Sequence, residues 1–383
     1  MSKPRTASEE MTLVVESVGA RGDGVARRDG RTVYIPFTAP GDRVRVRLGA
    51  SRGEGRTGEL VELLEAGERA TPVCPHFGSC GGCALQHLAP DAYARAKEQQ
   101  VAAALRQHGL DTTVIAPLLR LVPGTRRRAR FAIERPRSPK AVPFIGFNAR
   151  ASHRVVDMRV CAVLHPALVA LVPPLRAVAS LLWQPGASGA ATATLCDAGL
   201  DVLLDLAAAP DLAALETLAE FAAAADLARL AWRAPGCDAA TPAAVRRPPR
   251  AVFSGVPVDL PFDPFLQASA EAETALTAEV LEGVGTARRV ADLYAGLGTF
   301  TFALVQRAAV HAVEGARPAA TALAAAAARA GLGGRVSSEL RDLEARPLMA
   351  GELAGFDAVV FDPPRAGARA QSAALAAAPV PRV

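Results

Sequence analysis

The sequence lacks the features that would place a protein in or across a membrane. No uninterrupted apolar stretch reaches the ~18 residues that a transmembrane helix requires. Met1–Glu10 is polar and mixed in charge, without the apolar core of a secretory signal. We therefore expect a cytoplasmic protein with no membrane partner. The sequence also has no internal repeat, so a repeat architecture is not expected.

Cysteine is scarce, with 6 in 383 residues, but its placement is uneven. Cys74, Cys80 and Cys83 fall close together around a Gly-Gly pair, and Cys161 lies in the next cysteine-bearing segment. Thiolates are soft ligands that suit an iron–sulfur cluster or zinc. Disulfides are rare in the cytosol, and four-cysteine zinc sites more often use paired C-x2-C knuckles than the single pair here. The spacing favours an iron–sulfur cluster and leaves structural zinc open.

Basic residues are concentrated in one block of this 383-residue chain, whose length predicts two or three domains. The formal charge is +5, but residues 120–159 hold eleven basic and two acidic residues, so the remainder carries −4. Such a block is typical of contact with a polyanion, and a solvated charged surface is the alternative. We predict RNA contact by the arginines at the centre of the block, Arg126, Arg127, Arg128 and Arg130.

The first sixty-odd residues read as a small β-structure. Short runs rich in β-branched residues between 12 and 65 are separated by Gly- and Pro-containing turns. Arg43, Arg45 and Arg47 alternate with valines, which places three guanidinium groups on one face of a strand. Small barrels with a basic face commonly bind RNA. A helix is predicted over 91–109, and mixed β-structure over 121–206 with a connection near Pro173.

From about Phe262 the pattern changes to alternating strands and helices. Strands are predicted over 289–293, 310–314 and 356–362, and helices over 299–308 and 317–330. This βαβ series predicts a parallel sheet with its ligand at the carboxyl ends of the strands.

The loop after the first of these strands has the composition of a nucleotide-cofactor site. Asp292 precedes a turn with Gly296 and Gly298, and Glu314 ends the next strand, where it can accept hydrogen bonds from ribose hydroxyls. This combination favours S-adenosylmethionine over NAD, and a structural turn is the alternative. Asp362 begins an Asp-Pro-Pro-Arg sequence whose prolines end the later strand and hold the carboxylate at the pocket mouth.

Together these motifs resemble the S-adenosylmethionine-dependent RNA uracil-5-methyltransferase family, which modifies uridines in 23S rRNA and tRNA. The resemblance implies an α/β architecture in three parts. They are a TRAM/OB-like β-barrel at 1–66 that binds RNA, a mixed α+β central iron–sulfur domain at 67–260, and an incomplete Rossmann-like class I methyltransferase domain at 261–383.

The resemblance also implies roles for single residues. Cys74, Cys80, Cys83 and Cys161 match the four ligands of a [4Fe–4S] cluster, and Phe265 matches the residue that stacks on the target base. The acid beside the uracil corresponds to Asp362. The implied cofactor-binding positions are Gln267, Asp292, Tyr294, Gly296, Gly298, Glu314, Asp342 and Asp362.

The chain departs from the family pattern near its end. Family members carry a nucleophilic Cys one strand beyond Asp-Pro-Pro-Arg and a catalytic Glu further on, and neither has a counterpart before Val383. The thiolate activates uracil by adding at C6, and a base then removes the C5 proton. We therefore expect a C-terminally truncated, inactive monomer from a family of uridine-C5 methyltransferases.

Several functions stay open at this point. Methylation of 23S rRNA is preferred because of the TRAM-like barrel, with tRNA methylation as the alternative. A non-catalytic RNA-binding iron–sulfur protein is the second class. A radical enzyme is disfavoured, because its usual C-x3-C-x2-C spacing differs from the x5 spacing here and four thiolates close the cluster.

Overall fold

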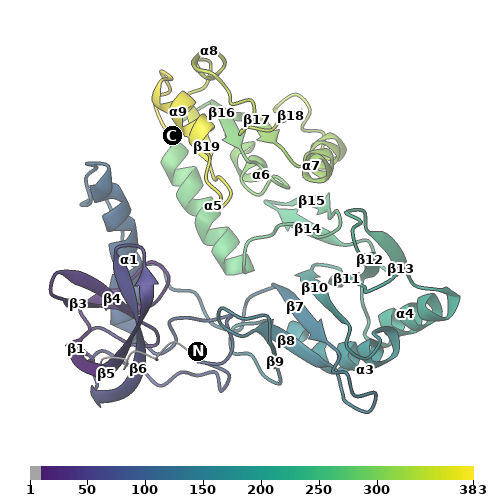
Figure 1. The fold of residues 1–383 in the computed structure, drawn as a ribbon. Coiled ribbons are helices and arrows are strands. Elements are labelled where there is room, and N and C mark those ends of the chain that lie inside the picture. Colours follow the sequence, from purple (N-terminus) through teal and green to yellow (C-terminus); the bar gives the residue numbers. More distant parts are fainter. Residues whose placement is uncertain (1–9) are drawn as a thin grey trace. The chain divides into compact units, whose positions relative to one another are not determined.

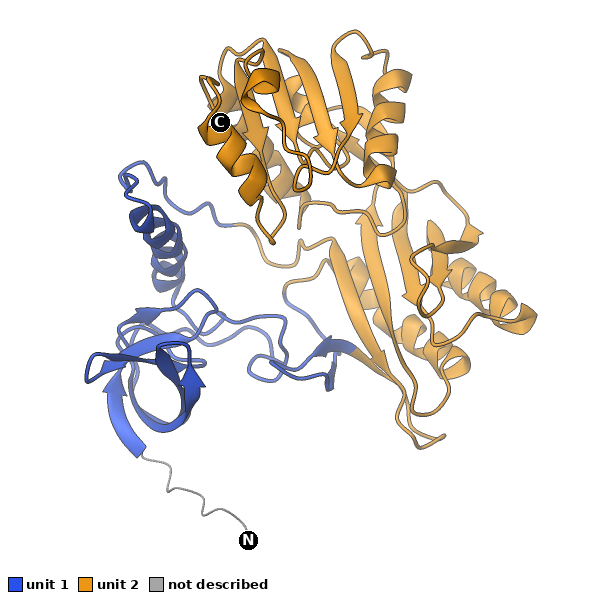
Figure 2. Ribbon diagram, turned by 45° about the horizontal axis from the view of Figure 1, so that its top comes forward, with its two compact units in different colours: residues 1–120, 146–162 blue, residues 121–145, 163–383 orange. Residues whose placement is uncertain are grey.

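The computed structural model describes residues 10–383 and divides into two compact units (Figure 2). Unit 1 comprises residues 1–120 and 146–162, and unit 2 comprises 121–145 and 163–383. The prediction about the polar N-terminus falls, except for Glu10, outside the described residues. Within residues 10–383, no helix is both long and apolar enough to cross a membrane.

Unit 1 is built around a six-stranded sheet in the order β1-β5-β6-β4-β3-β2. The predicted alternation is confirmed, because Val44 and Val46 are fully buried while the arginines between them face outward. Only the β4–β6 pair is parallel among the neighbouring pairs of this sheet within the described residues. The strands are β1 (Glu10–Val14), β2 (Ser17–Val18), β3 (Gly24–Arg28), β4 (Arg31–Ile35), β5 (Arg43–Arg52) and β6 (Gly55–Glu65).

The predicted helix after the barrel is α1 (Pro90–Gln107), which begins at a proline because the first helical residue needs no N–H donor. Its buried Ala92 and Ala96 pack against Val18 and Leu88. The rest of unit 1 includes β9 (Val155–Asp157), and the chain passes between the units within β8 (Phe144–Asn148).

The first part of unit 2 is a sheet flanked by helices. Five of its strands follow the order β13-β12-β11-β10-β7. The prediction of a connection near Pro173 is wrong: Pro173 lies in the first turn of α3, where its fixed φ suits a helix. The elements are β7 (Arg128–Glu134), α2 (Pro166–Ala170), α3 (Val172–Leu182), β10 (Ser188–Cys196), β11 (Gly199–Asp205), α4 (Leu212–Ala224), β12 (Arg229–Arg233) and β13 (Thr241–Val245).

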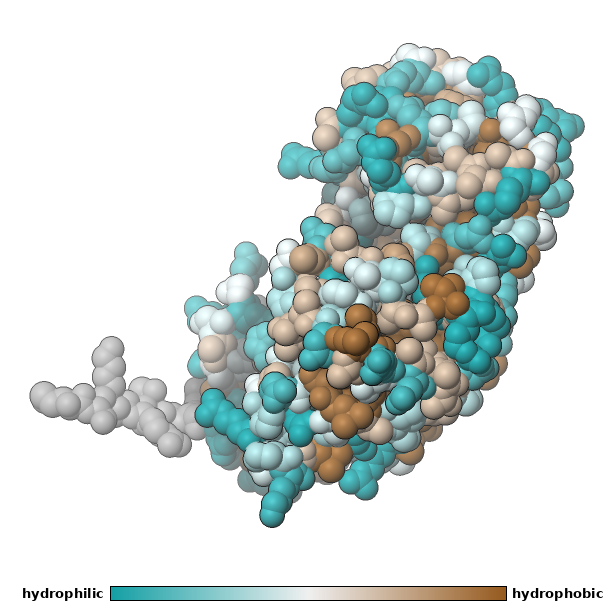
Figure 3. All heavy atoms as spheres, turned by 90° about the vertical axis from the view of Figure 1, so that its right-hand side faces the viewer, coloured by the Kyte–Doolittle hydropathy of each residue, from teal (hydrophilic) through white to brown (hydrophobic). Residues whose placement is uncertain are grey.

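Apolar side chains also reach the surface of this part. Figure 3 shows one face of the molecule, where apolar residues form small patches among polar ones. Leu181 on α3 and Leu212 on α4 are among the exposed apolar residues. Scattered exposure of this kind is ordinary for a folded protein.

The second part of unit 2 confirms the predicted parallel sheet, with strand order β18-β17-β16-β19 (Figure 1). Residues of α5, α6 and α7 share a core with one face of it, and residues of α8 and α9 share a core with the other. The elements are β14 (Arg250–Phe253), β15 (Val256–Asp259), α5 (Ala270–Val284), β16 (Arg289–Leu293), α6 (Thr301–Leu304), β17 (Ala309–Glu314), α7 (Arg317–Arg329), β18 (Val336–Leu340), α8 (Ala350–Leu353), β19 (Ala358–Phe361) and α9 (Arg369–Ala376).

Two details of this sheet differ from the sequence analysis. The helix predicted over 299–308 is the shorter α6, whose continuation tightens into turns such as Arg307 N–H to Leu304 O. Strand β18 was not predicted, because only Val336 of its five residues is buried and the segment has little apolar character.

Candidate functional site

The main cavity of the second part of unit 2 lies at the carboxyl ends of β16, β17 and β19. Ligands bind at this edge in parallel α/β sheets. Its volume is about 1320 Å³, which is ample for a nucleotide-sized ligand. The lining residues that the sequence analysis singled out are Phe265, Gln267, Tyr294, Gly296, Glu314 and Asp362. Parallel strand packing therefore brings together residues almost one hundred positions apart.

A buried carboxyl group lies near the end of β16, beneath the cavity. Asp292 is 1% exposed, and Oδ2 accepts a 2.5 Å hydrogen bond from the Thr301 hydroxyl of α6. Burial raises the pKa of Asp292 to about 7; the Thr301 bond opposes this rise, and the charges of Asp362 and Glu314 add to it. Asp292 thus joins the strand to the following helix beneath the cavity and does not line it.

Glu314, at the end of β17, is bonded to the turn that follows β16. Its two carboxylate oxygens accept backbone hydrogen bonds from Gly296 at 2.8 Å and from Ala316 at 2.6 Å. The carboxylate is fixed between the loops after β16 and β17. Because an ionised carboxylate can accept several hydrogen bonds, it retains capacity for a ligand hydroxyl.

The two glycines of the turn have different structural roles. Both have positive φ, 58° at Gly296 and 92° at Gly298. A Cβ on Gly298 would lie 2.6 Å from the Phe302 ring, whereas one on Gly296 would meet no atom within 4 Å. Gly298 is needed for packing against α6, and Gly296 keeps space open at the cavity.

Tyr294 also has a left-handed backbone, with φ of 62°, and its ring lies 5.9 Å from that of Phe361. Its buried hydroxyl has no hydrogen-bond partner. Burial raises the pKa of this hydroxyl, and the charges of Glu344, Asp342 and Glu314 raise it further. Tyr294 therefore lines the cavity with part of its side chain, while its hydroxyl is shielded from solvent.

Another wall comes from residues 260–268 and from α5. Phe265 is 70% exposed although it is a large apolar side chain, and it lies beside Gln267 on the lining. Leu276 and Val280 of α5 also line the cavity and were missed by the sequence analysis. Their spacing of four residues is the signal that could have identified this helix face.

Asp362 follows β19 at the cavity, and desolvation raises its pKa above 3.8. Asp342 does not line the cavity; its Oδ1 accepts hydrogen bonds from the backbone of Glu344 at 3.0 Å and Ala345 at 3.3 Å. Of the predicted cofactor positions, Asp342, Asp292 and Gly298 therefore do not line the cavity.

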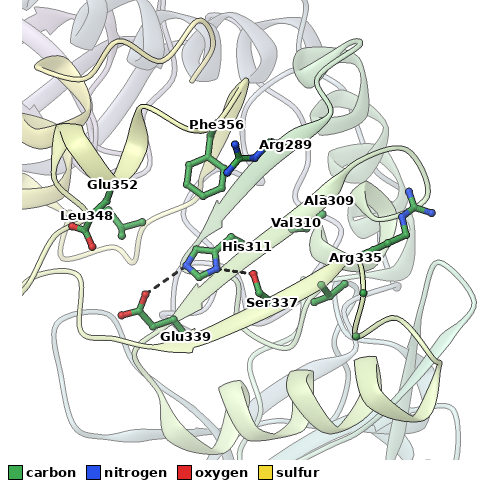
Figure 4. A pocket seen from close by; sticks show the side chains of 13 residues that line it. Arg289, Ala309, Val310, His311, Arg335, Ser337, Glu339, Leu348, Glu352 and Phe356 are labelled. Carbon is green, nitrogen blue, oxygen red and sulfur yellow. Dashed lines mark hydrogen bonds and ion pairs between the residues drawn. The ribbon is translucent and has the colours of Figure 1, made fainter.

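A smaller cavity of about 390 Å³ extends from the amino ends of β16, β17 and β18 along one side of the sheet to Leu348 and Glu352 (Figure 4). His311 Nδ1 lies 2.9 Å from the Ser337 hydroxyl and Nε2 lies 3.5 Å from Glu339, while its ring stacks on Phe356. The amino ends of parallel strands are not the usual ligand edge. We therefore assign the candidate site to the larger cavity.

The four predicted cluster ligands all lie in unit 1. Burial raises the pKa of Cys80, the hydrogen bond from the Gly82 N–H opposes this rise, and the charges of Cys83, Cys74 and Cys161 add to it. None of the chain's cysteines, all of which are described, forms a disulfide. Within residues 10–383, no group of three or more His, Cys, Asp and Glu side chains is arranged to hold a metal ion.

The cysteine loop packs closely on its neighbouring segment. Gly81 N–H donates to Asn148 O at 2.9 Å, and a Cβ on Gly81 would lie 2.7 Å from that oxygen. Gly82 N–H also points to the Cys80 sulfur at 3.4 Å, a contact that would stabilise a thiolate. The Gly-Gly pair therefore lets the loop approach the segment that leads to Cys161.

The predicted basic face of the barrel is charge-compensated. Arg43 pairs with Glu65 at 2.5 Å, Arg45 with Glu62, and Arg47 with Glu10 at 2.7 Å and Glu59 at 3.2 Å. Cross-strand pairing places these acids opposite the arginines on β5. RNA binding by these three arginines stays a prediction, and would require exchange of glutamate partners for phosphate.

Most of the arginines at the centre of the basic block also have hydrogen-bond or ion-pair partners within the protein. Arg127 is bonded within unit 2 to Glu273 and Gln267, Arg128 pairs with Asp263 at 2.6 Å, and Arg130 pairs with Asp205 at 2.7 Å. Arg126 is exposed and its Nε donates to Arg128 O at 3.1 Å. Arg126 is therefore the member of this block most available to a phosphate.

Comparison with known proteins agrees with this geometry. The TRAM-domain model of tRNA (uracil(54)-C(5))-methyltransferase matches residues 11–55. A Brucella suis biovar 1 protein, described as an uncharacterized RNA methyltransferase, is 40% identical over 379 residues, which cover 99% of this chain and 88% of its own. The 23S rRNA (uracil(1939)-C(5))-methyltransferase RlmD of Chromohalobacter salexigens is 35% identical, with coverage of 96% and 78%.

The fold also matches a solved structure. The crystal structure of Pyrococcus abyssi tRNA (uracil-54, C5)-methyltransferase, in complex with S-adenosyl-L-homocysteine, gives a TM-score of 0.68 at 19% identity. The match covers 95% of this chain and 87% of that one. The fold is thus a mixed α/β methyltransferase fold with an N-terminal TRAM domain. With these relatives, the chain belongs to the RNA uracil-5-methyltransferase family, which confirms the resemblance found in its motifs.

Replacing the packed glycine of the turn should destabilise unit 2. Gly298→Ala forces a Cβ against the Phe302 ring and should cost about 2–4 kcal/mol of unfolding free energy. Gly296→Ala incurs only the left-handed backbone penalty of about 1 kcal/mol. Urea unfolding of both variants measures the difference. Equal losses would show that close packing at Gly298 is not what requires glycine there.

The buried carboxyl group predicts a pH dependence of stability. The folded-state pKa of Asp292, about 7, lies above its ordinary value of 3.8. Its contribution to stability is therefore complete below pH 3.8 and is lost as the pH rises towards 7. Asp292→Asn should remove this loss, so the stability of the variant relative to wild type should increase from about pH 4 to about pH 7 and then level off.

The control for this titration is Asp357→Asn. The pKa of Asp357 is lowered because its carboxylate accepts backbone hydrogen bonds from Arg288 and Arg289, so this variant should lose stability relative to wild type at neutral pH. A constant difference between Asp292→Asn and wild type across the pH range would contradict the assigned titration.

Proposed function

We propose that this chain is built for S-adenosylmethionine-dependent methylation of uridine C5 in RNA, with 23S rRNA as the preferred substrate. The observation that carries the proposal is the single cavity that gathers Phe265, Gln267, Glu314 and Asp362 at the strand carboxyl ends. Its family relationship supplies the RNA methyltransferase class.

The cavity fits the proposed cofactor. Glu314 is held by backbone N–H groups with acceptor capacity to spare, and Gly296 leaves open space where a side chain would project. Gln267 offers a further polar contact. S-adenosylmethionine supplies an electrophilic methyl group on its sulfonium. We propose that Glu314 holds the ribose hydroxyls and that Gln267 contacts the cofactor near the base.

The same cavity also offers a surface for the target uridine. RNA bases are usually recognised unpaired and stacked on aromatic side chains, and Phe265 presents an exposed ring on the lining. We propose that Phe265 stacks on the target base or its neighbour. We propose that Asp362, which lines the cavity and whose pKa is raised by desolvation, hydrogen-bonds the uracil edge.

Covalent activation of uracil needs a thiolate that adds at C6, which makes C5 nucleophilic, and a base that removes the C5 proton before the thiolate leaves. None of the six described cysteines lines the cavity. The Cys196 thiol donates to Gly199 O at 3.1 Å, and its pKa is raised by burial. We therefore propose that these 383 residues bind cofactor and RNA without forming the covalent adduct.

Two relatives with assigned substrates support different RNAs. The Chromohalobacter salexigens relative is named for U1939 of 23S rRNA, and it is similar along most of both chains. The TRAM model and the Pyrococcus abyssi structure are named for tRNA U54. We favour 23S rRNA because the relative at 35% identity carries more weight than a fold match at 19%. tRNA methylation is the second candidate.

The proposed function is tested by binding and trapping. Wild type should bind S-adenosylhomocysteine in calorimetry, and Gly296→Ala should weaken binding about tenfold because its Cβ enters the cavity. Gly331→Ala is the matched control, because Gly331 also has positive φ and no neighbour within 4 Å but lies away from the cavity. Absence of binding by wild type would contradict the cofactor assignment.

The RNA step uses 5-fluorouridine-substituted 23S rRNA and tRNA fragments with S-adenosylmethionine. Fluorine blocks the final proton loss, so a working nucleophile stays bonded to RNA on a denaturing gel. We expect native-gel binding, tighter for the 23S fragment, without a covalent adduct. An adduct would show that a thiol of these residues performs the chemistry, and tighter tRNA binding would favour the second candidate.

We also propose that Cys74, Cys80, Cys83 and Cys161 hold a [4Fe–4S] cluster in unit 1. The chemistry of the donors supports the cluster, because thiolates are the usual ligands of iron–sulfur clusters and the Gly82 N–H already points at the Cys80 sulfur. The four thiols are not gathered into a metal-binding group within residues 10–383, so cluster binding would have to draw them together. The cluster would tie the loop of residues 74–83 to Cys161 as a structural link. A structural zinc ion is the competing occupant.

Metal content separates the two occupants. Protein purified anaerobically should contain about four iron and four sulfide ions per chain, and Cys80→Ser should lose most of them. Cys237→Ser is the matched control, because Cys237 is exposed and outside the set. One zinc ion and no sulfide in wild type would overturn the cluster, as would full iron content in Cys80→Ser.

A further inference from the structure

The segment that carries Phe265 and Gln267 has no regular secondary structure. Residues 260–268 connect β15 to α5 without helix or strand, and Asp263 within it has a left-handed φ of 52°. A segment without ladder or helix hydrogen bonds needs other partners for its carbonyl groups. Two arginines of unit 2 supply them, one at each end of the segment.

Arg229 holds the amino-terminal end. It is 8% exposed at the start of β12 and forms a two-pronged pair with Asp201 of β11, at 2.8 and 2.7 Å. The same guanidinium donates to Leu260 O at 3.1 Å and Pro261 O at 2.7 Å, and lies 4.3 Å from the centroid of the Phe262 ring. Its position fits the planar fork of arginine, which reaches acceptors on two sides.

Arg127 holds the carboxyl-terminal end. Its backbone N–H donates to Ala268 O at 2.8 Å, its Nε donates to Gln267 O at 3.0 Å, and its Nη2 pairs with Glu273 of α5. The side chain is 14% exposed. Arg127 was predicted to contact RNA, but its guanidinium is already occupied by the peptide of a proposed cofactor-binding residue.

We propose that Arg229 and Arg127 are positioning residues that hold residues 260–268 so that Phe265 and Gln267 face the cavity. This inference rests on the proposed function, because the placement of Phe265 and Gln267 matters only if the cavity binds the cofactor and the target base. The arginines contact backbone carbonyls near the motif residues, so they act through the segment and not on the ligand. The sheet of β11 and β12 thereby sets the geometry of a cavity wall built by a different part of the unit.

The test compares conservative substitutions in the full chain. Arg229→Lys and Arg127→Lys keep the charge for Asp201 and Glu273 but lose the fork that reaches the carbonyl groups. Arg233→Lys is the matched control: Arg233 pairs with Asp205 at 2.7 Å four residues further along the same two strands, and it forms no hydrogen bond or ion pair with residues 260–268 in the described structure. Amide hydrogen exchange and calorimetric S-adenosylhomocysteine binding are measured for each.

We expect exchange in the peptide covering 260–268 to rise about tenfold in both test variants and the dissociation constant for S-adenosylhomocysteine to rise about tenfold. Arg233→Lys should change neither, although its thermal midpoint falls by a similar amount. Unchanged exchange or unchanged affinity in the test variants, or equal effects in Arg233→Lys, would overturn the inference. Failure of wild type to bind S-adenosylhomocysteine would instead contradict the proposed function. Amide hydrogen exchange would still test whether the two arginines hold residues 260–268 in place.

Discussion

The close contact between Gly298 and the Phe302 ring is the constraint on which the site depends. Because the turn after β16 packs directly on α6, the chain reverses with no side chain between strand and helix. Asp292 is then buried against Thr301, and the backbone of Gly296 is brought to Glu314. The geometry of the cavity therefore depends on one tight turn. Forming this turn buries Asp292, which disfavours its ionised form and raises its pKa.

Arginine serves mainly as a structural cation in this chain. On β5 it pairs with glutamates across the strands, and in unit 2 it binds carboxylates and backbone carbonyls near the cavity. The local charge of the sequence predicted an RNA-binding block, yet most of those guanidinium groups have intramolecular partners. Charge counts describe a segment alone, whereas folding brings acids from distant segments to it, as Asp263 is brought to Arg128.

The chemistry of the site was more predictable than its walls. Glycines, an acid at a strand end and Asp-Pro-Pro-Arg are local signals, and all lie on or just behind the cavity. The contribution of α5 depends on which helix face meets β19, and α3 was missed because prolines at a helix start read as a connection. Strand β18 was missed because an edge strand with one buried residue has little pattern to detect.

The parallel βαβ order, the alternation of the barrel strand and the spacing of Cys74, Cys80 and Cys83 could be read from the sequence alone, because each depends on neighbours close along the chain. Only the tertiary structure decided which arginines are available to RNA, that Asp292 lies beneath the cavity, and that residues 260–268 are held by Arg229 and Arg127. The contacts of Arg127 join residues up to 146 positions apart. Their formation depends on how the sheets and helices pack, which no local pattern records.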